Sequence, residues 1–332
     1  MANLYITEQG SVLCKTGDRL IVRKDKEVLL DVSCHKIETI LIFGNVQFTT
    51  QAVSELFEHG IEMALLSRTG RLKGQLTPPM PKNIELRMAQ YERYKDSDFV
   101  LKLSKAIVSG KIKNCLALLE RFRHNHPETD LEIEINSLKR SVLEVEHRKT
   151  IQELMGVEGS AARIYFNGFA RMNLSGFSFD GRRKRPATDP INGLLSFGYT
   201  LLFNELSSLM DGIGFDPYLG FFHQIDYGRP SLAADLIEEF RAPVIDRFTL
   251  RLINNRTFSL EDFFLHEGSG SMHLKREGLK RYFEEYEKYM AQEFKHPVVQ
   301  RATFRKIFQE QAHRLAKTIR QEEEYIPFSF LR

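Results

Sequence analysis

The pattern of the sequence changes at residues 77–81, which read Thr77-Pro78-Pro79-Met80-Pro81. Proline lacks the backbone N–H that a strand ladder or a helix needs, so three prolines in five residues predict a linker. We place this linker at residues 77–83. It divides the 332-residue chain unequally into two regions. A typical domain size of ~150 residues also suggests two domains for a chain of this length.

The two regions differ in the spacing of their apolar residues. Residues 1–76 hold short apolar runs, such as 28–30 and 39–43, separated by Gly, Asp and Lys. This spacing predicts an antiparallel, β-sandwich-like N-terminal domain, with one helix between Thr49 and Gly60. Residues 84–332 carry apolar residues at helical spacing and predict a larger all-α domain. The predicted fold class is therefore α+β.

Cysteine usage and the start of the chain bear on the compartment. The three cysteines, Cys14, Cys34 and Cys115, form no Cys-x-x-Cys pair, so neither a disulfide framework nor a zinc ribbon is expected. The first residues do not resemble a signal peptide, and no run of ~18 apolar residues occurs. We expect a cytoplasmic protein that does not enter a membrane.

The formal net charge of +3 is unevenly distributed. Residues 1–80 carry equal numbers of basic and acidic side chains, whereas residues 163–185 carry six basic side chains against one acid, Asp180. Within this stretch the basic run Arg182, Arg183, Lys184 and Arg185 favours contact with phosphate groups. A solvated surface loop is an equally good interpretation of the run by itself.

The stretch from residue 221 to residue 241 contains possible metal ligands. Asp235 and Glu238 are three residues apart on an expected helix, so both carboxylates face one side, as does Arg241. His223 precedes the turn before this helix and could fold over that side. Two carboxylates and an imidazole suit Mg²⁺ or Mn²⁺. From spacing alone, a solvated acidic helix face is the stronger interpretation.

Two further positions carry polar side chains in suggestive surroundings. Glu158 lies between Gly156 and Gly159, where the small residues predict the start of a helix. A capping glutamate is the better interpretation of Glu158 alone. Asp189 before Pro190 is expected to cap another helix, with Asn192 in its first turn.

Taken together and in this order, the motifs resemble one family, the CRISPR-associated adaptation endonuclease and integrase or "Cas-one" family. The resemblance covers nearly the whole chain and rests on four stretches. They are Glu158 with Ala162-Arg163-Ile164-Tyr165-Phe166, then Asp189-Pro190-Ile191-Asn192 with Leu194-Leu195-Ser196 and Tyr199, then Gly220-Phe221-Phe222-His223, and Arg229 through Arg241. The basic run at 182–185 is longer than the usual form of the family.

The resemblance implies roles for particular residues. Glu158, His223 and Glu238 match the residues that hold Mg²⁺ or Mn²⁺ and carry catalysis. Asn192, Asp235 and Arg241 match positions that line the same site. Contacts with the DNA backbone are expected for Arg163, Arg182, Arg183, Lys184 and Arg185.

The resemblance also implies an activity and an assembly. The expected reaction is insertion of new spacer DNA into a CRISPR array by attack of a 3′-hydroxyl on a phosphodiester, with hydrolytic nicking when water attacks. The expected partners are double-stranded DNA, a second copy of the chain joined through the β domain, and a dimer of the small "Cas-two" protein. Two alternatives stay open: a metal-dependent hydrolase of small phosphate esters and a non-catalytic DNA-binding scaffold.

Overall fold

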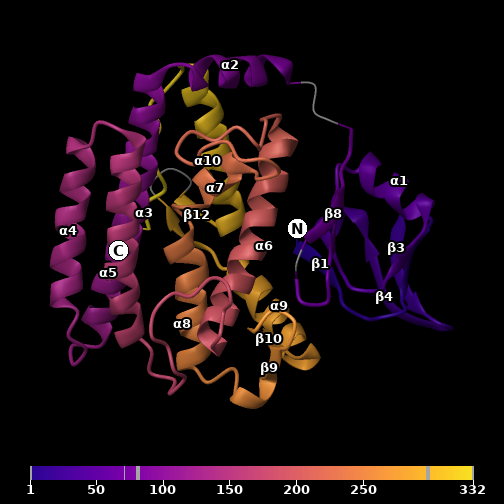
Figure 1. Cartoon of the computed structure of the whole chain (residues 1–332). Helices are drawn as coiled ribbons and strands as arrows, with labels where there is room; N and C mark the ends of the chain where they lie inside the picture. The colour runs from indigo at the N-terminus through magenta and orange to yellow at the C-terminus, as the bar shows by residue number, and fades with distance from the viewer. Residues whose placement is uncertain (1, 71, 80–82, 297–299, 331–332) are drawn as a thin grey trace. The chain divides into compact units, whose positions relative to one another are not determined.

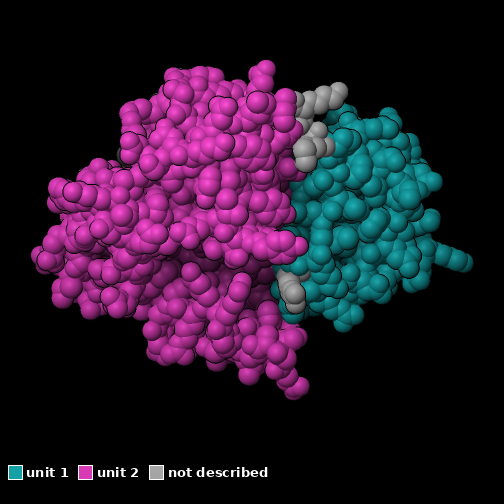
Figure 2. All heavy atoms as spheres, turned by 45° about the horizontal axis from the view of Figure 1, so that its top comes forward, with its two compact units in different colours: residues 1–80, 276–288 teal, residues 81–275, 289–332 magenta. Residues whose placement is uncertain are grey.

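The computed structural model describes residues 2–70, 72–79, 83–296 and 300–330. The chain forms two compact units (Figure 2). Unit 1 comprises residues 1–80 and 276–288, and unit 2 comprises residues 81–275 and 289–332. Residues 276–288, which the sequence predicts as part of the C-terminal region, thus belong to unit 1. Of the predicted linker, residues 80–82 lie outside the described residues.

Unit 1 contains two four-stranded sheets. The first has the order β1 (Ala2–Ile6), β5 (Ile37–Phe43), β7 (Glu62–Leu66) and β8 (Leu72–Leu76). The second has the order β4 (Glu27–Ser33), β3 (Arg19–Lys24), β2 (Val12–Thr16) and β6 (Gln47–Phe48). In the first sheet, β5 pairs in parallel with both β1 and β7, and β7–β8 is antiparallel. The expectation of antiparallel pairing throughout was therefore wrong.

The parallel pairing follows from the helix between β5 and β7. Helix α1 (Thr50–Glu58) begins where the Thr49 side chain accepts a hydrogen bond from the backbone N–H of Ala52, at 3.2 Å. It ends before Gly60, whose φ of +68° suits glycine. A connection that includes a helix returns the chain to the same end of the sheet, so the next strand runs in parallel.

The core of unit 1 receives side chains from both sheets and from α1. Leu13 and Leu20 come from one sheet, Ile40 and Met63 from the other, and Leu56 from α1, and all are buried. The short helix η1 (Cys34–Lys36) joins β4 of one sheet to β5 of the other. The two sheets therefore share one apolar core, as a sandwich-like domain requires.

The part of α9 that belongs to unit 1 adds aromatic packing. Helix α9 spans Arg276–Met290. The ring of Phe283 stacks on Tyr5 with centroids 4.1 Å apart and lies 5.1 Å from Phe43. The Tyr5 hydroxyl donates a hydrogen bond to the carboxylate of Glu287 at 2.7 Å.

Unit 2 is mainly helical (Figure 1). Its helices are α2 (Ile84–Tyr94), α3 (Ser97–Asn125), α4 (Glu132–His147), α5 (Ile151–Arg171), α6 (Pro190–Ile213), α7 (Ser231–Ile237), α8 (Arg247–Asn254) and α10 (Phe304–Ile319), with the short η3 (Leu260–Asp262). Helices α3, α4 and α5 pack against one another. Asp189 caps α6 by accepting from the N–H of Asn192 at 2.8 Å, as the sequence predicts.

The expectation that the C-terminal region is all-α needs correction. Two short antiparallel strand pairs occur there, β9 (Phe263–His266) with β10 (Ser271–Leu274) and β11 (Phe294–His296) with β12 (Gln300–Ala302). The first pair forms because Gly270, with a φ of +63°, lets the chain reverse after β9. Across the described residues, no helix combines the length and apolarity that crossing a bilayer requires.

The helical stretch after residue 230 is interrupted. Helix α7 ends at Ile237, and η2 (Arg241–Asp246) is a π-helical turn that leads into α8. Pro243 lies inside this turn and cannot donate the backbone hydrogen bond of a regular helix. A π-turn accommodates the proline, and such turns are frequent at functional sites.

Candidate active site

A cavity of about 670 Å³ in unit 2 collects most of the residues that the sequence predicted as functional. Its walls come from helices α3 to α6, the segments before α6 and α7, and the interrupted helix after α7. The predicted site residues that line it are Glu158, Arg163, Arg182, Arg183, Lys184, His223, Glu238 and Arg241. Asn192 and Asp235 lie behind this lining and are joined to it by hydrogen bonds.

Glu158 lies in the middle of α5, not at a helix start. The interpretation of Glu158 as a capping residue was therefore wrong. Thr150 caps α5 instead, by accepting a hydrogen bond from the N–H of Glu153. The position of Glu158 within a well-packed helix holds its backbone rigidly beside the cavity.

The Lys111 ammonium lies between the two predicted acidic ligands. It pairs with Oε1 of Glu158 and with Oε2 of Glu238, the second contact being 2.5 Å long. Burial lowers the pKa of Lys111, but the two carboxylates outweigh burial and raise it to about 12. The carboxylates of Glu158 and Glu238 therefore converge on one positive charge, the ammonium of Lys111.

His223 is held by Asp235 in one tautomer. Its Nδ1 lies 2.8 Å from Oδ1 of Asp235, and an ionised carboxylate only accepts, so Nδ1 carries the hydrogen. Asp235 also accepts from the backbone N–H groups of Phe221, Phe222 and His223. Its oxygens are thus occupied in orienting the loop, which leaves Nε2 of His223 as a lone-pair donor, 4.0 Å from Oε1 of Glu238.

The buried Glu238, just after α7, forms an ion pair with the partly buried Arg241, the first residue of the π-helical segment. Nε of Arg241 donates to Oε1 of Glu238 at 2.9 Å, and the guanidinium lies 4.7 Å from the centre of the Tyr199 ring. Burial raises the pKa of Glu238, but Arg241 and Lys111 outweigh burial and hold it well below its usual range. Glu238 is therefore ionised at any pH at which the protein would work.

Asp246 also lines this cavity, and sequence reasoning missed it. Asp246 accepts hydrogen bonds from the hydroxyls of Tyr165, at 2.8 Å, and Tyr199. Burial raises the pKa of Asp246 to about 6 against the opposing effect of these two bonds. Asp246 and Arg241 are five residues apart and line the same cavity, because the π-turn pairs residues at that spacing. Pro243 within an expected helix was the available signal.

The basic run divides into one partly buried side chain and three exposed ones. Arg182 donates to the side chains of Asn192, at 2.8 Å, and Ser196, at 3.0 Å. Its guanidinium also lies 5.3 Å from the centre of the Tyr199 ring. Arg183, Lys184 and Arg185 are exposed. Burial lowers the pKa of Arg182. Its guanidinium is already bound by protein side chains, and its expected contact with the DNA backbone stays a prediction.

The residues fit a divalent cation. Two carboxylates and one oriented imidazole form a donor set typical of Mg²⁺ or Mn²⁺, and a positive charge, that of Lys111, already lies between the carboxylates. Among the described residues, only Cys34, Glu55 and His59 place one donor atom each within 4.8 Å of one another. The donors of Glu158, His223 and Glu238 are spread more widely, with Lys111 between the carboxylates.

Comparison with known proteins places the chain in one family. The family model of the CRISPR associated protein Cas1 matches residues 4–288. The chain belongs to this family. Among curated relatives, a CRISPR-associated endonuclease Cas1 of Thermus thermophilus is 36% identical, over 98% of this chain and 96% of the relative.

Solved structures show the same fold. A casposase bound to integration product superposes with a TM-score of 0.88 at 23% identity, covering 99% of this chain and 94% of the casposase chain. A chain of a Cas6-RT-Cas1–Cas2 complex superposes with a TM-score of 0.83 at 25% identity, covering 99% of this chain and 36% of the longer chain.

Proposed function

We propose that the chain is a divalent-metal-dependent DNA endonuclease and integrase that inserts spacer DNA into a CRISPR array. The observation that carries the proposal is the convergence of Glu158 and Glu238 on the Lys111 ammonium, with Nε2 of His223 4.0 Å from Oε1 of Glu238. These three side chains would hold Mg²⁺ or Mn²⁺. When bound, the ion would polarise a phosphodiester and neutralise charge that develops on it.

The remaining residues of the site have separable tasks. Asp235 fixes His223 in the tautomer that leaves Nε2 available, as positioning groups behind metal ligands do. Arg241 presents a guanidinium at the cavity wall, fixed by Glu238 and Tyr199. Arg163, Arg183 and Lys184 line the cavity as well and would contact the phosphate groups of DNA.

The same cations speak against the rival small-ester hydrolase. A site for a single small phosphate group does not need the six arginine and lysine side chains, besides Lys111, that line this cavity: Arg163, Arg182, Arg183, Lys184, Arg229 and Arg241. A duplex carries a continuous series of phosphates and would use the exposed cations among these. We therefore favour DNA as the substrate.

The partners belong to the proposal too. A structural relative is part of a complex named for both Cas1 and Cas2, which supports assembly of this chain with a Cas2-type protein. We propose a homodimer through unit 1, because edge strands such as β4 and β8, the outer strands of their sheets among the described residues, offer a route to pairing.

The decisive experiment is a strand-transfer assay with a 3′-hydroxyl DNA end and a repeat-containing duplex, with Mn²⁺ as the metal. Glu158→Gln and His223→Ala should each lower the rate by about 10²–10³-fold, while Glu153→Gln, on the same helix but outside the cavity, should retain it. Full activity in either site variant would contradict the assignment. Retained hydrolysis of a small phosphate ester with no activity on DNA would favour the hydrolase, and array expansion in cells carrying both variants together would favour the scaffold.

A further inference from the structure

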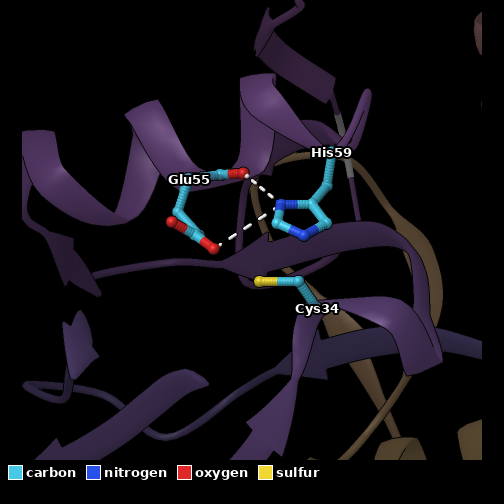
Figure 3. A group of neighbouring side chains, drawn as sticks. All are labelled: Cys34, Glu55 and His59. Atoms are coloured by element: carbon cyan, nitrogen blue, oxygen red, sulfur yellow. Dashed lines mark hydrogen bonds and ion pairs between the residues drawn. The ribbon is translucent and has the colours of Figure 1, made fainter. Parts of the chain in front are cut away.

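A second cluster of ligand-type side chains lies in unit 1, apart from the site described above. Cys34, Glu55 and His59 each place one donor atom within 4.8 Å of the others (Figure 3). Cys34 begins η1, Glu55 lies on α1, and His59 is the residue at which α1 ends. The spacing of four residues puts Glu55 and His59 on one face of the helix, toward η1.

The burial of the cluster separates it from a chance surface grouping. Cys34 is 1% exposed and Glu55 is 3% exposed, and the His59 side chain is 25% exposed. A buried carboxylate is rare unless it is paired. Among the described residues, Lys15, whose side chain is partly exposed, pairs with Oε2 of Glu55, and the ring of His59 lies 3.6 Å from Oε1.

The second oxygen of Glu55 and the second nitrogen of His59 are available to a ligand. Nδ1 of His59 lies 3.0 Å from the backbone carbonyl oxygen of Glu55, so Nδ1 donates the hydrogen and Nε2 keeps its lone pair. Figure 3 shows the second ring nitrogen on the side that faces Cys34. Oε1 of Glu55 lies 3.6 Å from Nδ1 and faces the same space.

This arrangement has the features of a prepared metal site. A histidine ligand usually donates its other ring N–H to a carbonyl or carboxylate, which fixes the ring and raises the basicity of the ligating nitrogen. Nδ1 of His59 donates in this way to the backbone carbonyl oxygen of Glu55. A further imidazole, that of His35, has its ring centroid 5.0 Å from that of His59 and is exposed, so it can supply a fourth ligand.

We propose that Cys34, Glu55 and His59 bind a zinc-class divalent ion, with His35 or water in the fourth position. One thiolate, one or two imidazoles and one carboxylate form a donor set typical of Zn²⁺, whereas Mg²⁺ takes oxygen ligands. Binding replaces the thiol hydrogen of Cys34, and this proton is released to solvent. The cavity of unit 2, with its carboxylate oxygens, and this cluster would thus select different metals.

The location suggests what such an ion would do. Cys34 lies at the crossover from β4 of one sheet to β5 of the other, and α1 connects β6 to β7. One ion bound to both segments would join the crossover to the helix and stabilise the sheet pair in unit 1. This role does not depend on the activity proposed for unit 2.

The test uses the full chain freed of metal and titrated with Co²⁺, a spectroscopic substitute for Zn²⁺. The wild type should develop a thiolate-to-cobalt charge-transfer band in the near ultraviolet, and Zn²⁺ but not Mg²⁺ should abolish it. Cys34→Ser should lose the band, whereas Cys14→Ser, in the same unit, and Cys115→Ser, beside the cavity, should keep it.

A second variant guards against misfolding of Cys34→Ser. His59→Gln changes a partly exposed position at the end of α1 and should weaken Co²⁺ binding about tenfold or more. A wild type without the band, or a band that survives both Cys34→Ser and His59→Gln, overturns the proposal. Either result would leave the strand-transfer assay, and hence the function proposed for unit 2, unaffected.

Discussion

Glu238 and Glu239 are neighbours in the chain, both buried, and yet their surroundings shift their pKa values in opposite directions. Glu238 faces the cavity, where Arg241 and Lys111 hold its pKa well below the usual range. Glu239 faces residues 325–330, the C-terminal segment. Its carboxylate accepts hydrogen bonds from the hydroxyl of Tyr325, at 2.8 Å, and from the N–H of Phe328, at 2.6 Å.

The difference teaches that burial alone does not fix the charge of a carboxylate. Burial raises the pKa of Glu239 to about 7, and its neutral hydrogen-bond donors only moderate the rise. Burial has the same effect on Glu238, but two cations reverse it. Glu238 therefore presents a negative charge to the cavity, whereas Glu239 binds residues 325–328 through hydrogen bonds.

Removing Lys111 should break this contrast most strongly. Lys111→Met leaves the buried Glu238 and the half-buried Glu158 without the charge between them, so the metal-free protein should lose about 3–5 kcal/mol of its free energy of unfolding. Mn²⁺ should restore more stability to this variant than it adds to the wild type. Urea denaturation with and without Mn²⁺ measures both effects.

The matched control is Lys102→Met. Lys102 pairs with Glu324 on the surface, where both side chains are largely exposed, so its replacement should change stability by less than about 1 kcal/mol. Equal Mn²⁺ stabilisation of wild type and Lys111→Met would show that the ammonium does not occupy the position of a metal.

Glu239→Gln should remove a pH dependence. The usual pKa of 4.5 applies to the unfolded chain, and the folded value is about 7. Between these values the unfolded chain has released the proton and the folded protein keeps it, so rising pH favours unfolding. The wild type should lose up to about 3 kcal/mol from this residue between pH 4.5 and 7, and the variant should not.

Denaturation curves across this pH range provide the measurement. Glu153→Gln is a suitable control because Glu153 is exposed and the backbone N–H of Lys149 lowers its pKa, so that variant should keep the wild-type pH dependence. Parallel curves for wild type and Glu239→Gln would mean that Glu239 is ionised in the folded protein, as Glu238 is.

The smallest effect concerns the basic run, in which a partly buried side chain, Arg182, is followed by three exposed ones. Replacing the exposed Arg183, Lys184 and Arg185 with Gln should reduce the log–log salt slope of DNA binding by about 0.9 for each phosphate group that these side chains neutralise. Arg182→Gln should leave the slope nearly unchanged, because Arg182 is held by Asn192 and Ser196. A larger change for Arg182 than for its neighbours would reverse this assignment.

Much of the fold class could be predicted because it depends on local patterns. The prolines at 78–81 and the change in apolar spacing predict the two regions, and the Asp189 cap is readable from two residues. The parallel pairing of β5 with β7 was missed because strand direction depends on how a connection returns. The place of α9 depends on contacts of Phe283 with residues more than 200 positions away, which no local pattern contains.

The candidate site divides in the same way. Asp235, Glu238 and Arg241 share a helix face by spacing, so sequence reasoning could group them. Lys111 was missed because it is a single lysine on α3, and only tertiary packing places it beside Glu158 and Glu238. Asp246 was missed because a regular helix would not pair it with Arg241, and the π-turn does so.

The C-terminal segment has a consequence for the order of synthesis. Nδ2 of Asn114, on α3, donates to the backbone carbonyl oxygens of both Glu239 and Phe328. A Cβ at Gly110 would lie 2.5 Å from Cβ of Pro327, so this segment packs closely against α3, next to Lys111 in the chain. Because a ribosome makes residues 325–330 after all the helices and strands described above, the nascent chain cannot complete the support behind Glu238 until these residues have left the ribosome.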